Sequence, residues 1–186
     1  MKPRAGSIED ALMAAAAHPS SASGAIAKAA AHPRGGPGPF VAEAAYEAHH
    51  PSALAVYCSD GRFTQAVEEL LGSLGHARLD TLTIPGGAAL LNAWTASVLD
   101  ADHVQRAARF LITGHGIREV VLVAHAGCGY YRARHPNEKD LKAYQITDLR
   151  AAAGELRRTR SGLEVKAFYA MPRDGRVTFE AIDTSK

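Results

Sequence analysis

The sequence contains little of what several classes of protein require. Its 186 residues include only two cysteines, which excludes a disulfide framework and favours a reducing compartment, the cytoplasm. Neither charge dominates, because 21 Lys and Arg oppose 19 Asp and Glu, and a formal charge of +2 argues against binding to nucleic acid or to an anionic membrane. No run approaches about 20 apolar residues, so no transmembrane helix is expected.

The residues that are present suit one soluble globular domain preceded by an arm. Hydrophobic residues make up 47% of the chain and charged residues 22%, which are ordinary proportions for a globular protein. Residues 1–39 are rich in Ala, Pro and Gly, and we expect short helices near 7–17 and 25–31. This arm is either ordered against a partner subunit or a mobile tail. Residues 40–186 are expected to form a single α/β domain.

Short apolar runs alternate with helical patterns along this domain. Strands are expected at 53–57, 79–84, 119–124, 165–170 and 176–182. Helices are expected at 40–49, 63–71, 88–99, 100–114 and 139–160, the last with a break near Gln145, while 130–136 is expected to be a loop. Residues 171–175 carry a hairpin signal. The pattern predicts an α/β fold with a mainly parallel central sheet, helices on both faces and an antiparallel C-terminal edge strand.

Residues 58–62, Cys-Ser-Asp-Gly-Arg, lie between the first predicted strand and a predicted helix. A strand-to-helix turn is where an open α/β sheet presents its ligand-binding groups. Cys58, Asp60 and Arg62 alternate along this turn and can face one cavity. Around a metal ion, the thiolate serves as a ligand, the carboxylate serves as a ligand or a proton acceptor, and Arg62 holds the carboxylate.

The other cysteine lies in a second spacing that is typical of metal sites. His125 and Cys128 follow the apolar run 120–123, and their spacing suits two adjacent positions on a tetrahedral zinc ion. If the strands that precede Cys58 and His125 are neighbours in the sheet, their C-terminal ends bring Cys58, His125 and Cys128 within reach of one Zn²⁺. Three protein ligands leave one position of the zinc open.

The motif Cys-x-Asp-x-Arg, with a His-x-x-Cys that begins 67 positions after Cys58, resembles the β-class carbonic anhydrases. The resemblance runs from about residue 53 to residue 182 and includes Gly129 after the second cysteine. Ile84 and Pro85 depart from it, because they stand where the family has an Arg and an Asn. The resemblance implies the β-carbonic-anhydrase-like fold for the zinc-binding domain.

The same resemblance implies an activity. It is that of a zinc-dependent lyase of the carbonate dehydratase type, in which a zinc-bound hydroxide converts carbon dioxide to bicarbonate reversibly. Asp60 accepts a hydrogen bond from the hydroxide and orients it, and Arg62 restrains Asp60. If that pair breaks, Asp60 can become the fourth zinc ligand and close the site, and the family is known in both open and closed forms.

The resemblance also implies an assembly, a homodimer or a dimer of dimers. The family builds its site near a dimer interface, and its N-terminal helices often embrace the other protomer. The largely apolar stretch 88–99 of this chain fits that expectation, because it needs covering on all sides.

Other interpretations of the proposed site stay open. The enzyme can act on another small cumulene, carbonyl sulfide or carbon disulfide. The protein can bind zinc without turnover, for structure or sensing, or the cysteines can be two inert buried thiols. Asp60 and Arg62 can form an ion pair that only stabilises the turn.

Several residues near the site are open to two readings. Gly86 and Gly87 are more often turn glycines than ligand contacts. Tyr130 and Tyr131 can line the mouth of a pocket or simply pack. No specific role is expected for the histidines in or beside exposed stretches, namely His49, His50, His76, His103 and His115.

Overall fold

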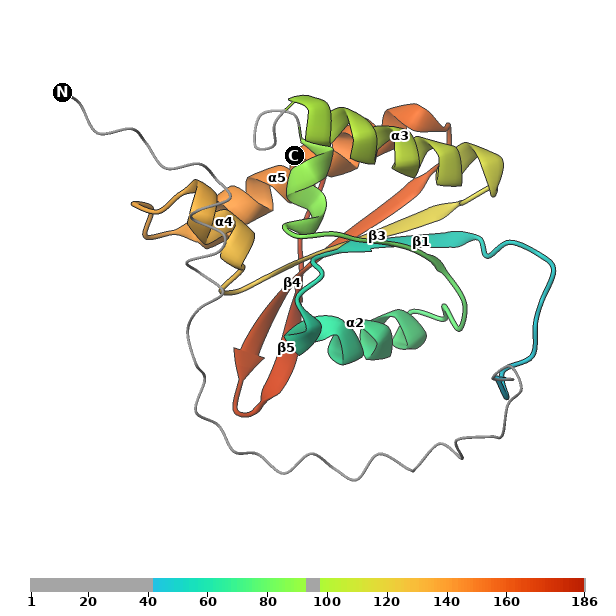
Figure 1. Cartoon of the computed structure of the whole chain (residues 1–186), viewed down its shortest axis with the longest axis horizontal. Coiled ribbons are helices and arrows are strands. Elements are labelled where there is room, and N and C mark those ends of the chain that lie inside the picture. The colour runs from blue at the N-terminus through green and yellow to red at the C-terminus, as the bar shows by residue number, and fades with distance from the viewer. Residues whose placement is uncertain (1–41, 93–97, 186) are drawn as a thin grey trace, which may run out of the picture.

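The computed structural model describes residues 42–92 and 98–185 (Figure 1). The elements in chain order are β1 (Ala53–Tyr57), α2 (Gly61–Ser73), β2 (Asp80–Thr83), the 3₁₀ helix η1 (Gly87–Leu91), α3 (Val98–Gly114), β3 (Glu119–His125), α4 (Gly129–Arg134), α5 (Leu141–Thr159), β4 (Glu164–Arg173) and β5 (Arg176–Ala181). All five predicted strands are present, with ends shifted by three residues or fewer.

The strands form one sheet in the order β2-β1-β3-β4-β5. The pairs β1–β2, β1–β3 and β3–β4 are parallel, and β5 runs antiparallel to β4 at the edge. β1 is buried along its whole length, and β3 is buried from Val120 onward, as continuous apolar runs in a parallel sheet require. The predicted fold class, mainly parallel with an antiparallel C-terminal edge strand, is confirmed.

Helices cover both faces of the sheet, with α3 and α5 on one side and α2 on the other (Figure 1). Side chains alternate across each strand, so successive residues of β1 enter different cores. Leu54 and Val56 pack with residues of α3 and α5, while Ala55 and Tyr57 pack with residues of α2. The three-layer arrangement therefore leaves the ends of the central strands as the places where polar groups can gather.

The C-terminal hairpin is tighter than the sequence indicates. β4 and β5 continue to Arg173 and Arg176, which are paired, so the turn consists of Asp174 and Gly175. Their φ angles are 49° and 75°. Asp-Gly with two positive φ values is the favoured sequence for a two-residue hairpin turn whose twist matches the strands. The hairpin is confirmed, and its loop is two residues long.

The prediction of one helix over 88–99 is wrong for the residues that the structure describes. Gly86 and Gly87 have φ angles of 84° and 53°, and the chain then makes the short 3₁₀ helix η1 instead of an α-helix. Asn92 is extended and ends η1. α3 begins at Val98, so Asp100 lies in its first turn and does not precede it.

Three further expectations about helices are wrong. Residues 42–49 are not helical. The segment expected as a loop at 130–136 contains α4, whose last turn carries Arg132 and Arg134, where cations suit the helix dipole. α5 runs through Gln145 without a break. Polar residues interrupt its apolar pattern there, but they are buried against partners and the helix continues.

The predicted N-terminal arm, with helices near 7–17 and 25–31, lies outside the described residues. The proposed boundary between residues 39 and 40 therefore stays a prediction. Within the described part of the chain, no helix has both the length and the apolar character needed to cross a membrane.

Candidate metal centre

The central strands β1 and β3 bring the predicted ligands to one edge of the sheet. They are parallel neighbours, and Tyr57 at the end of β1 pairs with Val123 of β3. Cys58 follows β1 directly, His125 is the last residue of β3, and Cys128 is the N-cap of α4. The carboxyl ends of parallel strands are the usual place for a ligand site in an open α/β sheet.

Cys58, His125 and Cys128 form a compact buried cluster. The two Sγ atoms lie 3.9 Å apart, and one potential ligand atom from each residue lies within 4.8 Å of the others. Tetrahedral zinc with Zn–S bonds of about 2.3 Å would place two sulfurs roughly 3.8 Å apart. The side chains therefore already have the spacing that one zinc ion requires. Among the described residues, no second group of three or more His, Cys, Asp or Glu side chains is placed to hold a metal ion.

The ring of His125 is oriented for a ligand at Nε2. Its Nδ1 lies 3.0 Å from the Ala126 carbonyl oxygen, which can only accept, so Nδ1 carries the proton. Nε2 is buried and has no hydrogen-bond partner among the described residues. The Phe63 ring lies 4.3 Å from the imidazole and holds it from one side. A buried acceptor without a partner needs an explanation, and a metal ion at Nε2 supplies one.

The two thiols share their protons unequally. A hydrogen bond from Cys128 lowers the pKa of Cys58, against the opposing effect of burial. The same contact, together with burial, raises the pKa of Cys128. The contact therefore favours ionisation of Cys58 over Cys128, and a divalent cation that binds both sulfurs would require both as thiolates.

Asp60 and Arg62 form the predicted pair beside the cluster. The Arg62 Nε and Nη2 atoms donate to the two carboxylate oxygens at 2.9 and 2.5 Å. Asp60 also caps α2, because its carboxylate accepts from the Arg62 backbone N–H at 3.1 Å. The hydrogen bonds from Arg62 lower the pKa of Asp60, so the carboxylate is ionised at neutral pH. Asp60 is turned to Arg62 and is not a member of the three-residue cluster.

Gly86 and Gly87 are turn glycines, and one of them also contacts the cluster. Both have positive φ angles, and a Cβ on Gly87 would lie 2.9 Å from the Cys58 backbone nitrogen. The Gly86 N–H points at Cys58 Sγ at 3.4 Å. Ile84 is half-buried and Pro85 is exposed. Neither side chain carries a hydrogen-bond donor.

Tyr130 and Tyr131 both pack, and their environments differ. Tyr130 lies over Gly86, where an added Cβ would be 2.5 Å from its ring, and its hydroxyl accepts from Arg134 at 2.9 Å. Tyr131 is buried and donates to Asp148 at 2.6 Å. Its partner Asp148 on α5 was not expected near the site.

Sequence reasoning missed the polar residues of α5 that contact the site. Gln145 and Asp148 are buried, and they occupy the same helix face as Leu149 and Leu156. The available signal was the spacing itself, because polar residues at i and i+3 on an apolar face need buried partners.

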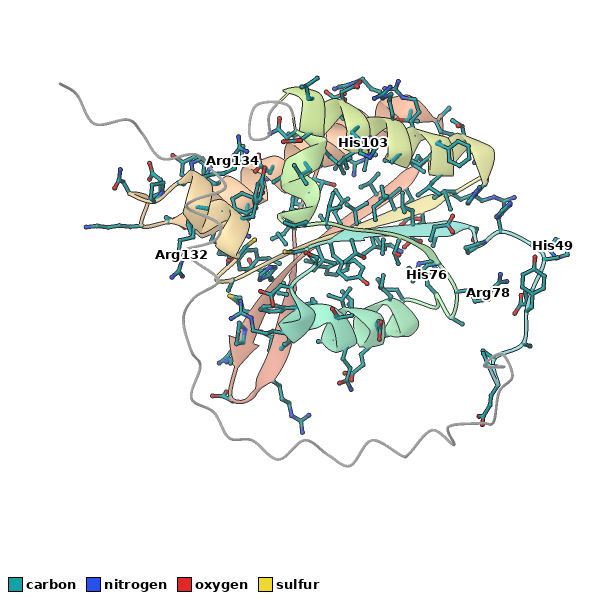
Figure 2. The ribbon with its side chains drawn as sticks, viewed as in Figure 1. His49, His76, Arg78, His103, Arg132 and Arg134 are labelled. Atoms are coloured by element: carbon teal, nitrogen blue, oxygen red, sulfur yellow. The ribbon has the colours of Figure 1, made fainter. Side chains whose placement is uncertain are left out.

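The histidines for which no role was expected lie away from the cluster, and two of them contact carboxylates. Figure 2 shows His76 and Arg78 at the end of the sheet opposite α4, and His103 on α3. His76 contacts Glu119 at 2.9 Å, and His115 contacts Asp80 at 2.7 Å. These contacts lie away from the cluster, and the expectation that these histidines have no specific role stays a prediction.

Comparison with known proteins gives one family. The family model described as "Putative carbonic anhydrase" matches residues 48–179, more than half of the chain. That segment contains Cys58, Asp60, Arg62, His125 and Cys128. A separate comparison with curated proteins finds no match.

Solved structures with a similar fold include three sets of β-carbonic anhydrases. One from Aspergillus fumigatus has 17% identity and a TM-score of 0.44, covering 74% of this chain and 78% of that chain. One from Trichomonas vaginalis has 15% identity and a TM-score of 0.47, covering 72% and 84%. The tetrameric enzymes of Sordaria macrospora give 15% identity and a TM-score of 0.46, covering 70% and 81%.

Gly87→Ala should destabilise the protein, because its positive φ and its contact with the Cys58 backbone leave no room for a Cβ. Strain of this kind is worth about 1–3 kcal/mol. Gly72→Ala is the control, since nothing lies within 4 Å of its added Cβ inside α2, and it should stabilise by roughly 0.5–1 kcal/mol. Urea unfolding of both variants measures this, and wild-type stability of Gly87→Ala would contradict the packing described.

Proposed function

We propose that this chain, which belongs to the carbonic anhydrase family whose model it matches, binds one Zn²⁺ and interconverts carbon dioxide and bicarbonate. The observation that carries the proposal is the buried cluster of Cys58, His125 and Cys128, in which His125 Nε2 lacks a partner among the described residues. Three protein donors are typical of a catalytic zinc, whereas a structural zinc usually has four.

When bound, zinc would act as a Lewis acid and make water available as a nucleophile near neutral pH. The residues around it position the reactants. Asp60 presents an ionised carboxylate that accepts a hydrogen bond from the attacking water and orients it. Arg62 keeps that carboxylate in place with hydrogen bonds to both of its oxygens. Without the Arg62 side chain, only the cap on the backbone N–H of residue 62 would hold Asp60, and the carboxylate could turn toward the cluster and become a fourth ligand.

A groove passes beside the cluster, although none of the three cluster residues lines it. A groove of about 1050 Å³ runs between α2 and the β4–β5 hairpin, and its walls include Phe63, Ala126 and Gly127 beside the cluster. Phe63 and Ala126 offer apolar surface next to His125, which suits uncharged carbon dioxide. Arg62 lines the same groove and can attract bicarbonate.

A second candidate, a zinc-binding protein without turnover, is favoured by Ile84 and Pro85. These residues place no donor side chain where the resembled family has an Arg and an Asn. A stopped-flow assay of carbon dioxide hydration on protein of verified zinc content separates the two candidates. Carbonyl sulfide and carbon disulfide in parallel assays test the related hydrolase activity.

We place the protein in the cytoplasm, where its two free cysteines would stay reduced. Cell fractionation with antibody detection tests this location, and recovery from a secreted or membrane fraction would contradict it.

The first prediction concerns the metal. The purified protein should carry close to one zinc per chain, and Cys58→Ser or Cys128→Ser should lose it, because a hydroxyl is a far poorer zinc ligand than a thiolate. Ser59→Ala, next to Cys58 and exposed, is the matched control and should keep the zinc. Elemental analysis measures the content, and full retention in both serine variants would remove the basis for this site.

The second prediction concerns Asp60 and Arg62. Asp60→Asn and Arg62→Ala should keep zinc and fold, yet hydrate carbon dioxide about 10²–10⁴-fold more slowly, the range for losing a positioned proton-handling group. Arg106→Ala is the control, because Arg106 is about as exposed as Arg62, at 67% against 70%, and its loss deletes an ion pair with Asp102 on α3. If the wild type is active and either site variant keeps the wild-type rate, these residues do not have the proposed roles.

The third prediction concerns assembly, a homodimer or a dimer of dimers. The start of the apolar stretch 88–99 does not supply such an interface, because Ala88, Ala89, Leu90 and Leu91 are already buried within the chain. Leu99 and Phe110 of α3 are instead 82% and 64% exposed, and their spacing places them on one helix face. A second copy that covers this face would remove both side chains from water. Light scattering at micromolar concentration should give a dimer or larger, and a monomer would contradict the prediction.

A further inference from the structure

Helix α5 carries two buried polar side chains on the face that packs toward the metal cluster. Gln145 is 2% exposed and Asp148 is 3% exposed. Their neighbours on that face are apolar, namely Leu149, Ala152, Ala153 and Leu156. Burial of an amide and a carboxylate is unfavourable unless each finds a hydrogen-bond partner, and an apolar residue would avoid this cost. The partners of these two residues are therefore informative.

Gln145 binds the backbone of a predicted zinc ligand. Its Nε2 donates to the His125 carbonyl oxygen at 2.9 Å, in a buried contact. His125 ends β3, and the next residue, Ala126, still donates to the Ala170 carbonyl of β4 at 2.9 Å. The His125 ring is held separately through Nδ1 and the Ala126 carbonyl oxygen. Backbone and ring are thus both fixed, with Nε2 left to face the cluster.

Asp148 connects helix α4, which follows Cys128, to the 3₁₀ helix η1, whose N-cap Gly86 contacts Cys58. Its Oδ2 accepts from the Tyr131 hydroxyl at 2.6 Å, and its Oδ1 accepts from Asn92 Nδ2 at 2.8 Å. Tyr131 lies in the first turn of α4, directly after the N-cap Cys128. Asn92 ends η1, which follows Gly86, the residue whose N–H points at Cys58 Sγ.

The Tyr131 hydroxyl is a dependable donor. In its 2.6 Å contact with Asp148 the hydroxyl donates and the carboxylate oxygen accepts. Each contact of Gln145 and Asp148 lies one short segment away from a cluster residue. Together they reach His125, Cys128 and the loop beside Cys58 from a single helix.

We propose that Gln145 and Asp148 are positioning residues, an α5 clamp that holds the segments bearing His125 and Cys128, and the η1 segment beside Cys58, at the spacing a metal ion requires. The inference rests on the proposed metal site and assigns a role to residues that touch neither the metal nor the substrate. Partners of this kind, one step behind the ligands, typically change metal affinity by 10–100-fold when they are removed.

The test uses two mild variants of the full-length protein. Gln145→Met keeps the side-chain length and removes the donor to His125, and Tyr131→Phe removes only the hydroxyl that Asp148 accepts. Ile112→Val is the matched control, because Ile112 is a fully buried residue of the core cluster that contains Leu149 and Ala152 of α5, and it makes no polar contact with the site. Circular dichroism establishes that each variant is folded, and Tyr131→Phe, which deletes one atom, is the variant least able to unfold the chain.

Two measurements report on the site without relying on activity. Competition against a chelator gives the zinc dissociation constant, and the absorption spectrum of the Co²⁺-loaded protein reports ligand geometry. Gln145→Met and Tyr131→Phe should each bind zinc 10–100-fold more weakly and shift the cobalt spectrum, while Ile112→Val leaves both at wild-type values. A purely structural role would lower the melting temperature of all three variants and leave the zinc affinity and the spectrum unchanged.

The outcomes separate the clamp from the proposed function. If the wild type binds zinc and both clamp variants match it in zinc affinity and cobalt spectrum, the clamp is overturned and the metal site stays intact. An equal loss of affinity in Ile112→Val would also overturn it, since the effect would then follow general stability. Wild type that binds neither Zn²⁺ nor Co²⁺ would overturn the metal site and the clamp together.

Discussion

The parallel pairing of β1 with β3 is the constraint on which the rest of the site depends. The register that joins Tyr57 to Val123 fixes where both strands end, and so it fixes the distance from Cys58 to His125. A slip of one residue would send every side chain of the slipped strand to the opposite face of the sheet. Both core clusters oppose such a slip, because each takes alternate residues from both strands. Packing on two faces thus sets the geometry of three residues at one edge.

A second constraint comes from helix α5, which covers one face of that sheet. Most of its buried face is apolar and stabilises the core, but Gln145 contacts the end of β3, and Asp148 contacts α4 and the end of η1. Their hydrogen bonds to His125 and Tyr131 use the rigidity of a long helix to hold short loops. Loops alone rarely keep side chains within the tolerance that metal ligation needs, and a rigid element behind them supplies it.

Much of this arrangement could be predicted from the sequence, and the limits have physical causes. Continuous apolar runs gave the strands, and placing Cys58 and His125 just after two of them was enough to predict one cluster. The 3₁₀ turn after Gly86 was not predictable, because left-handed glycines can lead into several geometries. The break expected near Gln145 was wrong, because a pattern of polarity cannot show that a buried amide has a partner.

The site combines interactions of very different strength, and that difference has a consequence for control. The three cluster residues are nearly enclosed, whereas the side chain of Arg62 is 70% exposed and that of Asp60 is 19% exposed. An ion pair with an exposed partner is worth only about 0–1 kcal/mol, so water can compete for Arg62 at little cost. The side-chain contact that restrains Asp60 is therefore weak, and only the cap on the Arg62 backbone N–H remains when water displaces it. If zinc binds as proposed, the rigid cluster sets whether the metal is held, and the Asp60–Arg62 pair sets whether its open position stays free.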